Sequence, residues 1–260
     1  MGSRIQNQMI ESVYQPMWNL NDWKVFGYEA LLRFPDGYCN GNIEMAFNMA
    51  REDGCLYELD TRSITNAINS FPIHQLGEEL LFINIYPSTL LHEEFELFIH
   101  KLLDNYPHSK GKIVFELNET KEEAYMWAIP ELQKKIEILK EYGFYIALDD
   151  VGKGAATLRK IIEFSPDYIK LDRYFAKELN ASKRKQHIVS LLIQYSKNKM
   201  GLILEGIEEA IDLAQAKALN VPVAQGYLLG KPTKVENIFS VICASHWQMM
   251  SSTMILLYLS

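Results

Sequence analysis

The chain has 260 residues, of which 48% are hydrophobic and 23% charged, a balance typical of a soluble globular protein with a large core. Its formal net charge of −7 argues against a general grip on duplex nucleic acid, which needs a basic surface. The three cysteines include no CxxC pair, so neither a disulfide framework nor a structural zinc site is indicated, and a cytoplasmic location is expected.

Neither end of the chain is expected to be a targeting signal or a membrane span. Residues 1–10 lack the apolar core of a signal peptide and are expected to be a flexible N-terminal segment. The C-terminal run MILLYLS is too short to span a bilayer and is interpreted as the end of a packing helix, with a membrane contact as the alternative. Since no linker-like stretch interrupts the sequence, residues 1–260 are expected to form a single domain.

The predicted elements begin with a β-hairpin. Its strands are the runs SVYQPMWNL and WKVFGYEALLRF, joined by the turn-forming pair Asn21-Asp22. Helical periodicity follows in MAFNMAREDG, and a further helix is expected over much of 57–71. The chain is therefore expected to start with an antiparallel strand pair.

After this start, short apolar runs alternate with helical segments. The runs have the length of strands and are LLFINIYP (80–87), KIVFELNE (112–119), FYIALDD (144–150), DYIKLD (167–172), GLILEGIE (201–208) and VAQGYLLG (223–230). The helical segments include IPELQKKIEILKEYG and KQHIVSLLIQYSKNK. Apolar strands separated by helices favour a parallel sheet covered by helices. The α/β fold predicted is a TIM-like (β/α)8 barrel with an antiparallel first strand, and a doubly wound open sheet is the alternative.

Polar residues recur where these strands end. They are Glu29, Asn84, Glu116, Asp149 with Asp150, Lys170, Glu205 and Gln225. One carboxylate in such a place is more often a helix cap or a surface residue. The carboxyl ends of barrel strands all meet at one mouth, however, so the repeated arrangement predicts a single cluster there. Strand alternation agrees, because Glu116 shares a face with Val114, and Glu205 with Ile203.

Such a cluster of acids needs positive charge. Hard oxygen ligands select Mg²⁺ or Mn²⁺, and the adjacent pair Asp149-Asp150 indicates one carboxylate that bridges two ions. Two metal ions are the usual arrangement for in-line displacement at phosphorus. The pattern therefore predicts a phosphodiesterase with about two ions per site.

The remaining members of the cluster allow several roles. Lys170 could hold the attacking water or neutralise charge at phosphorus, or it could simply pair with Asp172 or Glu205. Glu205 could orient Lys170, ligate the second metal or accept a proton from the water. Gln225 has no charge and is expected to order water or a neighbouring side chain.

The assembled residues resemble the EAL-domain family, the cyclic di-GMP phosphodiesterases of bacteria. The motif that names the family stands as Glu29-Ala30-Leu31, and the resemblance covers the chain from YQP at 14–16 to QGYLLGKP at 225–232. The ordered series between them is EALLR, FINI, FELNE, DDVG, YIKLD and EGIEE. The resemblance implies hydrolysis of one bond of cyclic di-GMP to give linear pGpG.

The resemblance also implies roles for individual residues. Ligands of the first metal would be Glu29, Asn84, Glu116 and Asp149, with Asp149 shared with a second ion that Asp150 also holds. Lys170, Glu205 and Gln225 would be catalytic. Gln15 and Arg33 match substrate-contacting positions, and Glu119 matches an acid that steadies the loop after Asp150 and does not bind metal.

Two stretches depart from the family pattern. The usual DDFG and TGYSSL-like sequence is replaced by DDVGKGAATL, in a loop that the resemblance links to the second metal and to a homodimer. In FINIYPSTL, Tyr86 stands where the family has a small residue. The first departure bears on activity and its regulation, and the second bears on substrate fit.

Two other functions compete with hydrolysis of cyclic di-GMP. A catalytically silent EAL domain would bind cyclic di-GMP or a partner protein as a receptor, but such members normally lose metal ligands or the lysine, and all are present here. A barrel enzyme acting on another diester, such as a glycerophosphodiester, would use a histidine pair near the metal. None of the six histidines follows a predicted strand, which argues against it.

Overall fold

The computed structural model describes residues 8–118, 120–152 and 157–238, and its strands close into a barrel. The strands, in barrel order, are β1 (Glu11–Asn19), β2 (Val25–Arg33), β3 (Leu80–Ile85), β4 (Ile113–Leu117), β5 (Tyr145–Val151), β6 (Tyr168–Leu171), β7 (Gly201–Leu204) and β8 (Val223–Ala224). Strand β1 is antiparallel to both β2 and β8, and the remaining neighbours are parallel. The predicted barrel with an antiparallel first strand is confirmed, and the open sheet is excluded.

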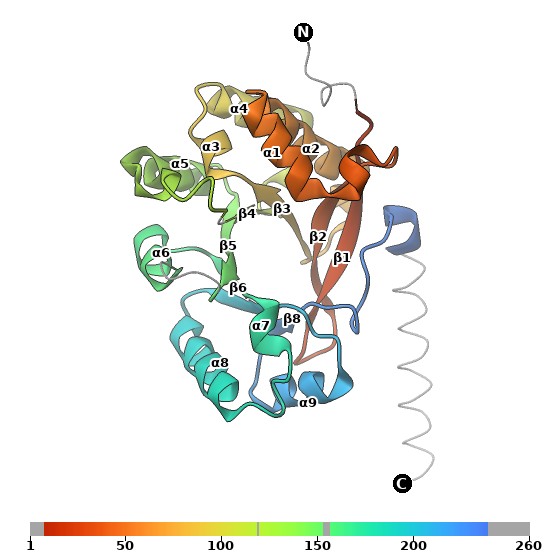
Figure 1. The fold of residues 1–260 in the computed structure, drawn as a ribbon, viewed down its shortest axis with the longest axis vertical. Coiled ribbons are helices and arrows are strands. Elements are labelled where there is room, and N and C mark those ends of the chain that lie inside the picture. Colours follow the sequence, from red (N-terminus) through yellow and green to blue (C-terminus); the bar gives the residue numbers. More distant parts are fainter. Residues whose placement is uncertain (1–7, 119, 153–156, 239–260) are drawn as a thin grey trace.

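The helices lie around the outside of the ring of strands, as Figure 1 shows. They are α1 (Ile43–Glu52), α2 (Leu56–Ser70), α3 (Pro87–Leu90), α4 (Phe95–Asn105), α5 (Pro130–Glu141), α6 (Thr157–Phe164), α7 (Arg173–Ala176), α8 (Lys183–Ser196) and α9 (Ala210–Ala218). Short 3₁₀ helices are η2 (Tyr38–Gly41), η3 (Ile73–Gln75), η4 (Pro107–Ser109) and η5 (Met126–Ala128). The helices expected from periodicity at 45–54, 57–71, 129–143 and 185–199 correspond to α1, α2, α5 and α8.

Three buried clusters hold these layers together. The largest lies between the strands and the outer helices. A second, formed by β2, α1 and α2 with Tyr86, contains Leu32, Phe34, Ala46, Phe47, Ala50, Cys55, Leu56 and Leu59. The third fills the barrel interior and consists of Met17, Leu80, Phe82, Val114, Ala147, Ile203 and Val223. Because side chains alternate along a strand, the residue two positions after the last interior residue of each parallel strand points into the same end of the barrel.

Most of the strands are shorter than the apolar runs from which they were predicted, and β1 and β5 are as long as theirs. β8 contains only Val223–Ala224, so Gln225 follows the strand directly, as Glu205 follows β7. Glu29 differs, because it lies in the middle of β2 and not at its end. Strand β2 pairs with β3 only from Gly27 to Ala30, while its pairing with β1 continues to Arg33. Glu29 thus stands near the end of the part of β2 that belongs to the parallel barrel.

Candidate active site

Lys170 is the centre of a buried cluster of carboxylates at the mouth of the barrel. It lies in β6 and is fully buried. Its Nζ atom is 2.7 Å from Glu205 Oε1 and 2.8 Å from Glu116 Oε1. The same atom is 3.4 Å from Glu29 Oε2 and 3.5 Å from Asp149 Oδ1. Four carboxylates that are distant in sequence, carried in or directly after four different strands, therefore surround one ammonium group.

Of the two acids considered as salt-bridge partners of Lys170, Asp172 and Glu205, only Glu205 pairs with it. Asp172 lies just after β6 and caps helix α7, where its Oδ1 accepts a hydrogen bond from Tyr174 N at 2.8 Å. It does not pair with Lys170, whereas Glu205 does. Lys170 thus interacts with the carboxylate cluster and not with the loop that follows β6.

A local irregularity in β5 places two successive acids on the same side. Regular alternation would send Asp149 and Asp150 to opposite faces of the strand. The register of β5 against β6 shifts between Leu148 and Val151, and Asp150 has a left-handed backbone with φ of 52°. Oxygen atoms of Asp149, Asp150 and Glu205 consequently lie within 4.8 Å of one another. Bulges of this kind redirect side chains next to active sites.

Two glutamines extend the cluster toward β1 and β8. Gln225 Nε2 donates to Glu29 Oε2 at 2.6 Å and to Gln15 Oε1 at 3.2 Å. Gln15 lies opposite Glu29 in the β1–β2 pairing, and its Nε2 donates to the Gly230 carbonyl at 2.9 Å. These bonds fix the orientation of the Glu29 carboxylate.

The other predicted site residues that the structure describes make no ion pair with Lys170. Asn84 is beside Glu116 in the β3–β4 pairing, and its Oδ1 accepts a hydrogen bond from Asn118 Nδ2 at 2.7 Å. Arg33 lies at the end of β2 and donates to the Leu32 carbonyl at 2.7 Å. Among the described residues no carboxylate pairs with Arg33. Glu119 lies outside the described residues, as do 153–156 of the DDVGKGAATL loop and the C-terminal apolar segment.

Burial and charge act in opposite directions on the ionisation of the cluster. Burial raises the pKa of Glu116 well above its usual range and also raises the pKa of Asp149, while Lys170 opposes both shifts. Burial likewise raises the pKa of Glu205 to about 8. For Lys170, burial favours the neutral amine, but Asp149 and the other carboxylates outweigh it and hold its pKa well above the ordinary value. Lys170 therefore stays an ammonium.

The donor set fits hard divalent cations. Four carboxylates surround a single ammonium, so positive charge is in deficit whenever the acids are ionised. Both Glu116 oxygens are buried without a hydrogen-bond donor among the described residues, and Oε2 also has no ion pair there. A fully buried carboxylate oxygen without a partner is costly, and a metal ion would satisfy it. Carboxylate and amide oxygens are the ligands that Mg²⁺ and Mn²⁺ prefer.

A further buried acid, Asp60, lies outside the Lys170 cluster and was not identified from the sequence. It lies in α2, and its Oδ2 accepts a hydrogen bond from Tyr86 N at 3.0 Å. Burial raises the pKa of Asp60 from its ordinary value of 3.8 to about 7, and the Tyr86 hydrogen bond opposes the shift. The Tyr86 ring is buried in the cluster formed by β2, α1 and α2, 4.9 Å from the ring of Phe47. Tyr86, which stands where the family has a small residue, therefore contributes its ring to this core cluster.

Asp60→Asn is expected to change how stability depends on pH. Between about pH 4 and pH 7 the folded protein holds a proton on Asp60 that the unfolded chain has lost, so this group makes stability fall as pH rises. An asparagine side chain does not ionise, so it removes this contribution to the pH dependence of stability. Its oxygen can still accept the Tyr86 hydrogen bond. Relative to the parent, the free energy of unfolding of the metal-free variant should rise by about 2 to 3 kcal/mol between pH 5 and pH 8. Urea unfolding in EDTA measures it, and parallel pH profiles would contradict the assignment.

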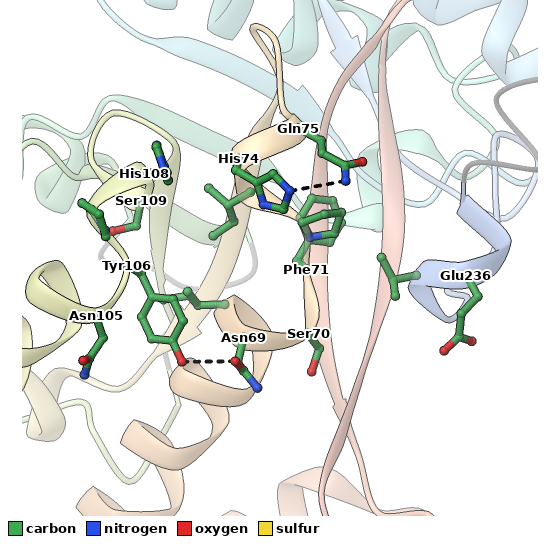
Figure 2. Close-up of a pocket in the computed structure, with 15 residues that line it drawn as sticks. Asn69, Ser70, Phe71, His74, Gln75, Asn105, Tyr106, His108, Ser109 and Glu236 are labelled. Carbon is green, nitrogen blue, oxygen red and sulfur yellow. Dashed lines mark hydrogen bonds between the residues drawn. The ribbon is translucent and has the colours of Figure 1, made fainter.

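A cavity of about 530 Å³ lies at the opposite end of the barrel. It is lined by residues 71–75 and 105–109, which lead into β3 and β4, and by Val235 and Glu236. Figure 2 shows it, with the Tyr106 hydroxyl directed at Asn69 and Gln75 beside His74. Since catalytic groups of such barrels gather where the strands end, this cavity is separate from the Lys170 cluster.

The fold and the cluster define a (β/α) barrel with an acid-rich, lysine-centred mouth, and comparison with known proteins identifies its family. The EAL domain matches residues 3–232, and the chain belongs to this family. It is 28% identical over 227 residues to the probable cyclic di-GMP phosphodiesterase PdeI of Escherichia coli. That match covers 85% of this chain and 28% of PdeI. The chain is 25% identical over 235 residues to the cyclic di-GMP phosphodiesterase RocR of Pseudomonas aeruginosa, with 88% and 58% covered.

Solved structures show the same architecture. BlrP1 of Klebsiella pneumoniae, in a complex with manganese and cyclic di-GMP, superposes with a TM-score of 0.75 at 25% identity. The match covers 87% of this chain and 57% of that one. The chain spans only part of its relatives, 28% of the length of PdeI and 58% of the length of RocR. In the described part of the chain, no helix combines the length and apolarity needed to cross a bilayer.

Proposed function

We propose that the chain hydrolyses one phosphodiester bond of cyclic di-GMP to linear pGpG, with two bound Mg²⁺ or Mn²⁺ ions. The observation that carries the proposal is the Lys170 cluster, in which four carboxylates from separate strands surround one ammonium within 3.5 Å. Membership of the EAL domain family and similarity to cyclic di-GMP phosphodiesterases support the choice of substrate.

The chain's own residues provide two groups of ligands. One ion would be held by Glu29, Asn84, Glu116 and Asp149, and a second by Asp149 and Asp150. Bound divalent ions activate a water molecule and neutralise charge on the phosphoryl oxygens. Gln225 holds the Glu29 carboxylate in place through the bond at 2.6 Å. Because the guanidinium of Arg33 engages only a backbone carbonyl among the described residues, it retains donors for a substrate phosphate.

Glu205 is the acid in the cluster best placed to exchange a proton with water. Its side chain keeps 19% of its surface exposed, compared with 15% for Asp149, 10% for Glu29 and none for Glu116. Burial raises the pKa of Glu205 to about 8 in the metal-free protein, and the positive charge of bound divalent ions would lower it toward the range in which a carboxylate accepts a proton from water. Lys170 Nζ contacts Glu205 Oε1 and would offer its charge to the developing phosphorane.

The test is an assay of the purified chain with cyclic di-GMP and Mg²⁺ or Mn²⁺, with pGpG separated by chromatography. We expect pGpG to form, EDTA to stop its formation, and Ca²⁺ to inhibit it. Tight binding of cyclic di-GMP without turnover would contradict the proposal and identify a receptor. The variant Lys153→Thr, run in parallel, tests the altered loop.

Two broader features of the chain stay predictions. A single domain over residues 1–260 and a homodimer through the loop after Asp150 both involve segments outside the described residues. Sedimentation of the whole chain, with and without Mn²⁺ and cyclic di-GMP, would measure its oligomeric state.

A further inference from the structure

A second buried polar network lies beside the mouth of the barrel and centres on Glu123. Glu123 follows β4, in the turn before η5, and is 1% exposed. Its Oε2 accepts a hydrogen bond from Ser88 N at 2.8 Å, and its Oε1 accepts one from Ser88 Oγ at 2.8 Å. Arg51 Nη2 pairs with the same Oε1 at 3.0 Å. One carboxylate thus binds three donors from two other segments.

These segments are all attached to strands that carry predicted metal ligands. Arg51 is in the last turn of α1, the first α-helix after β2. Ser88 is in α3, four residues after Asn84 of β3. Glu123 is seven residues after Glu116 of β4. The Glu123 network therefore joins the segments that follow β2, β3 and β4.

The segment that carries Asn84 is held at three further points. Asn118 Nδ2 donates to Asn84 Oδ1 at 2.7 Å, and Asp60 accepts from Tyr86 N at 3.0 Å. The Arg51 guanidinium carbon lies 5.4 Å from the centre of the Tyr86 ring. Between residues 84 and 88, the chain is thus fixed by hydrogen bonds on both sides and by a stacked cation.

The cost of this arrangement argues for a role in positioning. An ion pair of this kind generally gains little net stability, because the Glu123 carboxylate loses its hydration and the Arg51 guanidinium loses most of it. Glu123 compensates for this only by binding three donors, two of which come from the Ser88 backbone and side chain. What these contacts determine is the position of the turn after β3, and hence of Asn84.

We propose that Arg51 and Glu123 are positioning residues, which hold Asn84 where it can ligate a divalent ion. This inference rests on the proposed function, because it assigns Asn84 to the metal site. Partners that orient a ligand typically change metal affinity by about 10-fold to 100-fold when they are replaced. Removal of the Glu123 charge should therefore weaken metal binding while the carboxylate ligands themselves stay unchanged.

The experiment is titration calorimetry of Mn²⁺ into the full chain without substrate. We expect Glu123→Gln and Arg51→Met each to weaken Mn²⁺ binding about 10-fold, and Arg51→Lys to recover part of the loss. At saturating Mn²⁺, kcat should stay within about threefold of the parent. Glu96→Gln is the matched control, because it breaks a salt bridge to Lys135, between α4 and α5, in which no residue of the Glu123 network takes part. It should leave Mn²⁺ affinity unchanged.

The outcomes separate this inference from the proposed function. Parent-like Mn²⁺ affinity in Arg51→Met, whose side chain is 24% exposed and is the more tolerant position, would overturn the inference even if Glu123→Gln fails to fold. A parent that binds no Mn²⁺ would also overturn it. If the parent binds Mn²⁺ and the variants bind it more weakly, but cyclic di-GMP is not hydrolysed, the proposed function fails and the positioning role stands.

Discussion

Lys170→Met is expected to destabilise the metal-free protein by about 3 to 5 kcal/mol and to abolish hydrolysis of cyclic di-GMP. Its ammonium is the shared ion-pair partner of Glu29, Glu116, Asp149 and Glu205. Methionine keeps much of the volume but leaves buried acids without positive charge. The raised pKa of Glu116 lets it take up a proton, which limits the loss.

Divalent ions should reverse much of this destabilisation. Because bound Mn²⁺ supplies positive charge to the same acids, the rise in melting temperature on adding Mn²⁺ should be larger for Lys170→Met than for the parent. Unfolding by urea in EDTA, and thermal unfolding with and without Mn²⁺, measure the two effects. Lys135→Met is the control, since its salt bridge to the half-exposed Glu96 should contribute at most about 1 kcal/mol. Equal stability of Lys170→Met and the parent in EDTA would contradict the central place given to Lys170.

The barrel could be predicted because its signals are local and repeated. Apolar runs of strand length alternate with helical periodicity, and Asn21-Asp22 marks the opening hairpin. Strand alternation also predicted correctly that Glu116 and Glu205 extend the face of Val114 and Ile203, which lie in the interior cluster. Both arguments use only residues that are close together in the sequence.

The detailed shape of the mouth depends on the strands together and could not be predicted in this way. Alternation alone would separate Asp149 from Asp150, and only the register shift against β6 brings them to one side. Glu29 was expected at a strand end, but its strand continues beyond it because β1 offers a pairing partner as far as Arg33. Both features follow from pairing between strands, which one segment of sequence does not encode.

The Glu123 network was missed for a related reason, although one of its neighbours left a signal. Asp60 occupies a helical position between the buried residues Leu59 and Ile64, where periodicity calls for an apolar side chain. A charged residue there indicates a buried partner. Arg51 and Glu123 gave no such signal, since they lie in polar stretches 72 residues apart and meet only in the folded barrel.

Asp149→Asn is expected to reduce kcat for cyclic di-GMP by more than about 10³-fold, which corresponds to about 4 kcal/mol of transition-state stabilisation. Asp149 is the residue assigned to both ions, and an amide of the same shape lacks the charge needed to bridge them. Its effect on stability should have the opposite sign to that of Lys170→Met. Burial already raises the pKa of Asp149, so a neutral side chain removes a destabilising charge from the metal-free protein.

These two readouts make the prediction specific to metal binding. We expect Asp149→Asn in EDTA to unfold at a urea concentration equal to or above that of the parent, and to lose most of the stabilisation that Mn²⁺ gives. Asp172→Asn is the matched control, because Asp172 caps α7 next to the site without contacting Lys170, and it should retain turnover. Activity of Asp149→Asn within about tenfold of the parent would contradict the two-ion assignment. Loss of activity together with a collapse of stability in EDTA would instead show that Asp149 serves the fold.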